Sequence, residues 1–138
     1  MRLSNLADYA VVMLAAAARI GCGADARVTA TELAGTTKVP LATAQKVLGQ
    51  LAAAGLLTSG RGTRGGFALA RPAAAISVAE IVEAMEGPIA LAGCLGEAEQ
   101  PCALTDHCLV RPHWPPINDA VRGALAGVSL AHLSAGPP

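Results

Sequence analysis

Aromatic side chains are almost absent from this sequence, whose 138 residues contain one Trp, one Tyr and one Phe. Hydrophobic residues still make up 53% of the chain, so we expect a core built from Ala, Leu and Val. No run of eighteen apolar residues occurs, which excludes a membrane-spanning helix. Asp8 interrupts the N-terminal apolar stretch, which therefore lacks the pattern of a signal peptide. We expect a cytoplasmic protein of one domain, or of one domain with an appended element.

An excess of charge of one sign is also lacking, because ten basic and ten acidic residues cancel. The two halves nevertheless differ. Residues 1–75 contain eight basic and three acidic side chains, a net charge of +5, whereas residues 76–138 contain two basic and seven acidic ones, a net charge of −5. This distribution predicts that only the first half meets a polyanion such as double-stranded DNA.

A catalytic constellation is missing as well. The three histidines have no paired nucleophile and no orienting carboxylate that the sequence reveals. We therefore do not expect an enzyme.

A pair of helices is the clearest pattern that is present. Thr29 and Glu32 form a capping box at the start of a short helix, which Gly35 should end. Pro40 introduces a longer helix over residues 41–54. Its apolar positions recur at helical spacing and should face a core: Ala44, Val47, Leu48, Leu51 and Ala52.

A glycine-rich turn over residues 60–66 follows, between short apolar strands at 56–58 and 67–69. A helix-turn-helix with such a hairpin, or wing, is a DNA-reading unit. Arg61 and Arg64 lie in the turn, where glycines allow close approach to phosphates or to the minor groove. The candidate DNA-contacting residues are Thr43, Gln45, Lys46, Arg61, Gly62, Arg64 and Gly65.

Two further helices frame this unit. Residues 1–20 are expected to be helical, with Ser4 as N-cap. Ser77 and Glu80 form a second capping box, which opens a helix that Gly87 ends. The carboxylates on the outer side of this helix are expected to be solvated: Glu83 and Glu86.

Regular periodicity is lost over residues 87–116, which contain Cys94, Cys102 and Cys108 at the spacing C-x7-C-x5-C. Three cysteines in an irregular loop of a cytoplasmic protein indicate metal ligands before disulfides. The spacing is not the paired C-x2-C of structural zinc sites, whereas thiolates on a loop suit an iron–sulfur cluster. Zinc and redox-active thiols remain alternatives. Cys22 is isolated and is expected to be a packing residue.

A last amphipathic helix is expected from Pro116, with Asp119 in its first turn. Helix-turn-helix proteins usually read two half-sites as dimers, so we interpret this helix as the contact of a homodimer; packing on its own winged helix is the alternative. Its apolar stripe is Ile117, Ala120, Val121, Ala124, Leu125 and Val128.

The expected fold class is mainly α with a small β-hairpin wing, a winged helix-turn-helix plus a long C-terminal dimerisation helix. We expect a DNA-binding domain at residues 1–75, a cysteine loop and dimerisation helix at 76–133, and a disordered tail at 134–138.

The chain to about Leu133 resembles the bacterial winged-helix regulators that include IscR and NsrR. The motifs that carry the resemblance are MRLSNLADYAVVML, LGQLAAAGLLTSGRGTRGGFALAR and ISVAEIVEAMEGPI, followed by the cysteines. VAEIVEAMEGPIAL and VSLAHL are most similar to the branch that regulates SUF-system cluster assembly. The resemblance implies a homodimeric transcription factor, here expected to be a repressor, whose iron–sulfur cluster (2Fe–2S or 4Fe–4S) alters DNA binding.

The resemblance also implies roles for single positions. Gln45 stands where IscR has a recognition-helix glutamate, and Arg61 where it has the wing arginine that enters the minor groove. Cys94 and Cys108 fall on cluster cysteines, and Cys102 falls on the middle one with two extra residues before it.

The fourth cluster ligand is open. Arg111 replaces the histidine ligand of IscR, and a guanidinium has no lone pair to offer. Asp8 matches the first-helix aspartate that comes from the other subunit in an NsrR-type site. His113 and then His107 are the local alternatives.

Two other functions remain open: a zinc- or thiol-based regulator without a cluster, and a cluster-carrying redox protein that does not bind DNA.

Overall fold

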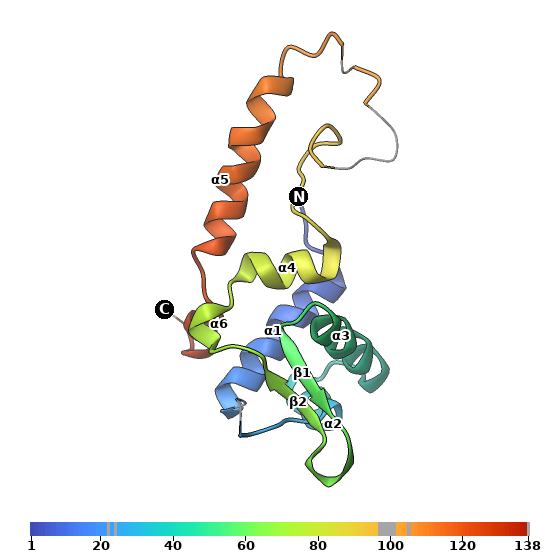
Figure 1. The fold of residues 1–138 in the computed structure, drawn as a ribbon, viewed down its shortest axis with the longest axis vertical. Coiled ribbons are helices and arrows are strands. Elements are labelled where there is room, and N and C mark those ends of the chain that lie inside the picture. The colour runs from blue at the N-terminus through green and yellow to red at the C-terminus, as the bar shows by residue number, and fades with distance from the viewer. Residues whose placement is uncertain (22, 24, 97–101, 105, 138) are drawn as a thin grey trace.

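The computed structural model describes residues 1–21, 23, 25–96, 102–104 and 106–137. Over these residues the chain is mainly helical with one two-stranded antiparallel sheet, as the sequence predicts (Figure 1). None of the helices in these ranges combines the length and the apolar character that crossing a bilayer requires. The helices and strands are α1 Asn5–Ile20, α2 Ala30–Thr37, α3 Leu41–Ala53, β1 Leu57–Gly60, β2 Gly66–Leu69, α4 Val78–Glu86, α5 Trp114–Ala126 and α6 Leu130–Ser134.

Helix starts follow the side chains that cap them. The hydroxyl of Ser4 accepts a hydrogen bond from the backbone N–H of Ala7, so α1 begins at Asn5 and not at Met1 as expected. Thr29 and Glu32 form the predicted capping box of α2. These side chains thus satisfy one N–H group at the start of α1 and two at the start of α2.

The expected end of α2 at Gly35 is wrong. The helix continues to Thr37 and ends at Lys38, which adopts a left-handed conformation with φ of 62°. Glycine inside a helix costs only about 1 kcal/mol. The hydroxyls of Thr36 and Thr37 each donate to a carbonyl oxygen one turn back, of Glu32 and Leu33, which occupies those oxygens within the helix.

The core is built from aliphatic side chains, as the scarcity of aromatics predicts. Five helices converge on it, and their central side chains have no exposed surface. The fully buried large residues include Met13 and Leu14 of α1, Leu33 of α2, Leu48 and Leu51 of α3, Ile81 of α4 and Leu130 of α6. Burial of such side chains is the main stabilising contribution to this part of the chain.

The wing is an antiparallel hairpin in which Leu57 pairs with Leu69 and Gly60 with Gly66. It is fixed to the helix pair by Val28, which exchanges two backbone hydrogen bonds with Phe67. Gly66 has φ of 111°, and a Cβ there would lie 2.7 Å from the carbonyl oxygen of Val28. Only glycine fits this close backbone approach.

The C-terminal end of the chain returns to the core. Leu130 is fully buried, and its N–H donates to the carbonyl oxygen of Ile76. Ser134, which the sequence analysis assigned to a disordered tail, is instead the last residue of α6, and its carbonyl oxygen accepts a hydrogen bond from Arg19 of α1. The division of the chain at residue 75 stays a prediction.

Helix α5 extends away from the other helices (Figure 1). It begins at Trp114, two residues before the expected start, so Asp119 does not lie in its first turn. Val128 of the expected stripe lies beyond its end. None of the α5 residues is buried, whereas α1, α3 and α4 each bury four or more.

Candidate functional site

Helix α3 presents a polar face opposite its buried one. Ala44, Val47 and Leu48 face the core, and this orients Gln45 and Lys46 to solvent and leaves Thr43 half-buried. A helix of this kind, second in a helix-turn-helix, is suited to the major groove. The structure thus exposes Gln45 and Lys46, two of the three predicted DNA-contacting side chains of α3.

The wing tip differs in detail from the predicted loop. Residues Gly62–Arg64 form a short 3-10 turn, and Arg61, which precedes it, is exposed. Gly62 has φ of 82°, and its carbonyl oxygen accepts a hydrogen bond from Gly65 N–H. A Cβ at Gly65 would lie 2.8 Å from that oxygen. The glycines are therefore required by the turn itself and leave no side chain beside Arg61.

A cation that the sequence analysis did not select supports the wing. The guanidinium of Arg27 donates from Nη1 to the carbonyl oxygens of Thr58 and Gly66, one on each strand, at 3.4 Å. A Cβ at Gly60 would lie 3.2 Å from this guanidinium. Arg27 therefore adds positive charge near the turn end of the hairpin, and only its charge was visible in the sequence.

The cysteines lie between α4 and α5. Cys94 and Cys108 are half-buried and Cys102 is exposed. The described part of the chain contains no group of three His, Cys, Asp or Glu side chains placed to hold a metal ion. Three thiolates suit an iron–sulfur cluster chemically, but this single chain does not gather them into a formed site. Cys22, the expected packing residue, lies outside the described residues.

The candidate fourth ligands are separated as well. Asp8 is exposed in the first turn of α1. His107 is exposed between Cys102 and Cys108, and His113 is exposed at the residue before α5. The N–H of Ser4 donates to Glu86 Oε1 of α4 at 2.5 Å, so the first turn of α1 lies at the end of α4 from which the cysteine segment departs.

The segment that leads to the first cysteine is held by an α5 side chain. Asn118 Oδ1 accepts a hydrogen bond from the N–H of Leu91 at 3.0 Å, and its Nδ2 donates to the carbonyl oxygen of Ile89 at 2.9 Å. The sequence analysis missed this residue. The available signal was an amide between Ile117 and Asp119 on a helix that was interpreted only by its apolar stripe.

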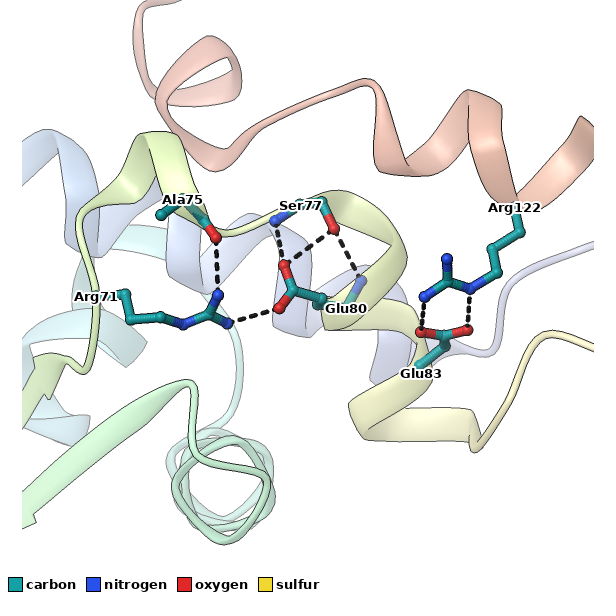
Figure 2. Close-up of polar contacts among 6 residues, drawn as sticks. All are labelled: Arg71, Ala75, Ser77, Glu80, Glu83 and Arg122. Atoms are coloured by element: carbon teal, nitrogen blue, oxygen red, sulfur yellow. Dashed lines mark hydrogen bonds and ion pairs between the residues drawn. The ribbon is translucent and has the colours of Figure 1, made fainter. Parts of the chain in front are cut away.

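The expectation that Glu83 is solvated is wrong, whereas Glu86 is exposed as expected. Glu83 accepts two hydrogen bonds from Arg122 of α5, Nε to Oε1 at 2.8 Å and Nη2 to Oε2 at 3.1 Å (Figure 2). The hydrogen bond from Arg122 lowers the pKa of Glu83. The backbone N–H of Ser4 likewise lowers the pKa of Glu86. Both partners are distant in sequence, so helical periodicity could not reveal them.

The start of α4 makes a third polar contact. Glu80 closes the predicted capping box with Ser77 and also accepts a hydrogen bond from Arg71 Nη2 at 2.6 Å (Figure 2). The backbone N–H of Ser77 and then the Arg71 guanidinium lower the pKa of Glu80. Arg71 follows the second wing strand, so α4 is connected to the wing at one end and to α5 at the other.

An apolar groove of about 870 Å³ lies between α5, the end of α4 and the N-terminal segment. Val121 and Leu125, members of the predicted stripe, lie on its α5 side and are half-buried. The remaining apolar lining includes Met1, Leu3, Val82, Ile89, Leu91 and Ala124.

Comparison with known proteins identifies relatives. A model of the Rrf2 family, described as iron-dependent transcriptional regulators, matches residues 3–136. A protein of Azotobacter vinelandii named as an HTH-type transcriptional regulator, ORF2, is 32% identical over 98% of this chain and 80% of its own. The regulator IscR of Escherichia coli O1:K1 is 29% identical over 96% of this chain and 80% of its own.

A solved structure shows the same fold. The global cysteine regulator CymR of B. subtilis has a TM-score of 0.74 and 22% identity, and the likeness covers 100% of this chain and 99% of that one. Its name and those of the sequence relatives describe regulators and not enzymes, in agreement with the missing catalytic constellation. With the family model spanning the helix-turn-helix, the wing and the cysteine segment, the chain belongs to the Rrf2 family of transcriptional regulators.

Proposed function

We propose that this regulator binds double-stranded DNA as a homodimer and that its cysteine segment senses iron–sulfur cluster or redox status in the cytoplasm. The observation that carries the dimer is α5, a helix of thirteen residues without one buried residue, beside an apolar groove. A helix with an apolar stripe has to bury it against another surface. A second copy of α5 offers a self-complementary surface about a two-fold axis.

Support for the DNA contacts comes from the exposed side chains of Gln45, Lys46 and Arg61. We assign Gln45, Lys46 and Thr43 of α3 to the major groove and its phosphates. Arg61 and Arg64 hold the wing on the DNA, and Gly62 and Gly65 allow its close approach. Selection of duplexes from a random pool, followed by gel shifts, tests this assignment; a cluster-carrying redox protein would select none.

For the sensor we propose the ligands Cys94, Cys102 and Cys108 with Asp8 of the second subunit, and His113 as the alternative. Support comes from the thiolate chemistry, from the iron-dependent regulators of the family and from the likeness to IscR. Repression of genes for iron–sulfur cluster assembly is the output that fits this signal.

A thiol-based regulator without a cluster is the second candidate. One observation favours it: among the described residues, no group of three His, Cys, Asp or Glu side chains is placed to hold a metal ion. In that case the thiol of exposed Cys102 is the accessible reactive group.

Anaerobic purification with an absorption spectrum and iron and sulfide counts separates the two candidates. A cluster gives both elements and a visible charge-transfer band, zinc gives neither, and a thiol regulator gives no metal. Each Cys→Ala variant should lose or destabilise the cluster. Asp8→Ala and His113→Ala identify the fourth ligand, because only the true ligand changes the spectrum. Cysteine variants with a wild-type cluster would remove this sensor.

A further inference from the structure

Helix α5 contains no buried residue, and two polar side chains one turn apart bind it to the rest of its own chain. Asn118 holds the backbone of Ile89 and Leu91, and Arg122 holds the carboxylate of Glu83. Residues four apart lie on the same face of a helix. One face of α5 is therefore directed to α4 and to the segment that precedes Cys94.

We propose that Asn118 and Arg122 are the positioning residues that couple the cysteine segment to the DNA-reading helix. This inference rests on the proposed sensing function. Leu91 lies three residues before Cys94, so a rearrangement at that cysteine pulls on the backbone that Asn118 holds. Arg122 transmits the position of α5 to Glu83 of α4, and α4 packs on α3.

The wing is connected to the same helix. Glu80, three residues before Glu83, accepts a hydrogen bond from Arg71, whose main chain follows β2 (Figure 2). Arg71 also donates to the carbonyl oxygen of Ala75 at 2.9 Å, which fixes the connection between wing and helix. A displacement of α4 therefore reaches both α3 and the wing, the two surfaces assigned to DNA.

The two contacts suit a switch because each is weak by itself. Hydrogen bonds and partly exposed ion pairs contribute little net stability, whereas the core side chains of α4 anchor it firmly. Loss of an Asn118 or Arg122 contact thus releases α5 without unfolding the helices beneath. A small local change can shift the balance between two arrangements of α5 only if the contacts that hold each arrangement are weak.

The first test uses the protein without iron. Asn118→Ala removes both hydrogen bonds, so exchange of the Leu91 amide hydrogen, followed by NMR, should become about tenfold faster. Asn118→Asp keeps an acceptor for Leu91 and should fall between Asn118→Ala and wild type. Asp119→Ala is the control for the Leu91 amide, because Asp119 is the neighbouring exposed residue of α5. Unchanged exchange in Asn118→Ala overturns the proposal.

The second test measures DNA affinity with a duplex selected by the wild-type protein. Affinities are compared before and after anaerobic reconstitution with iron and sulfide. The ratio of the two should move towards one in Asn118→Ala and in Arg122→Gln. A wild-type ratio in both coupling variants overturns the inference and leaves the sensor standing. A ratio of one in the wild type overturns the sensor and the coupling with it.

Discussion

The helices around the wing and the helix that follows the cysteines are stabilised in opposite ways. α1, α2, α3, α4 and α6 share one aliphatic core in which the largest side chains have no exposed surface. α5 has thirteen residues and buries none of them. The helices of the first group are stabilised by apolar contacts with one another within one chain. By contrast, α5 is held by the hydrogen bonds of Asn118 and Arg122, and its apolar stripe needs a further surface to cover it.

Under the proposed function, this difference would place DNA recognition in the packed helices and regulation in α5 and the cysteine segment. A DNA-binding surface needs α3 and the wing at fixed positions relative to each other. The packed core beneath them provides this rigidity. A sensing element has to move when its chemistry changes, and weakly held elements are those that can. Substitutions in the two regions test this difference in stabilisation, and the largest effect is expected in the packed core.

Leu48→Ala should lower the free energy of unfolding by about 2–5 kcal/mol, because it leaves a cavity where a fully buried side chain of α3 was. Leu109→Ala removes the same atoms from a side chain that is 90% exposed in the cysteine segment. That variant should stay within about 0.5 kcal/mol of wild type. Urea denaturation checks both; equal losses would refute the contrast between the two regions.

Val121→Asp should weaken self-association about a hundredfold or more, since the dimer would have to bury an unpaired carboxylate, at a cost of ~3 kcal/mol. Tight binding to a two-half-site duplex should be lost with it. Sedimentation equilibrium measures the change, with Ala126→Asp as the control on an exposed position outside the groove. If Val121→Asp stays dimeric, α5 packs only within its own chain.

Arg61→Ala should weaken specific DNA binding by about 1–3 kcal/mol if this side chain reads a base edge from the wing. Gln45→Ala should change which sequence is preferred more than it changes the salt dependence. Arg19→Ala, at the far end of α1 and bonded to the carbonyl oxygen of Ser134, removes an equal charge and should leave both properties unchanged. Gel shifts at several salt concentrations measure the affinity and its salt dependence. Unaltered binding in Arg61→Ala and Gln45→Ala would show that the wing and α3 do not contact DNA.

Glu83→Gln should lower the free energy of unfolding by only ~0.2–1 kcal/mol at pH 7, since the pair with Arg122 is partly exposed. Arg122 lowers the pKa of Glu83 from its usual 4.5, so the pair stabilises the fold above that value. Its contribution should disappear as the pH falls through the lowered pKa. Wild type and variant should thus converge towards pH 3 in urea titrations; a constant difference would contradict the ion pair.

Local patterns predicted most of the DNA-reading part. The caps Ser4, Thr29 and Ser77 and the hairpin pairing around Gly66 act within a few residues, so the sequence displays their causes directly. The error at Gly35 has a local reason too, because the threonine hydroxyls after it bind carbonyls within the helix and a left-handed Lys38 ends it. The cysteines were found by type and spacing, but their assembly into a site stays a prediction.

The sequence by itself determined where helices begin, which faces are apolar and which half is basic, because capping, periodicity and charge are properties of neighbouring residues. Only the tertiary structure decided that Glu83 meets Arg122, that Asn118 holds Leu91 and that Leu130 returns to the core beside Ile76. These partners lie 27 to 54 residues apart in the chain. Contacts over such separations depend on how packed helices are oriented, and no local pattern encodes that orientation.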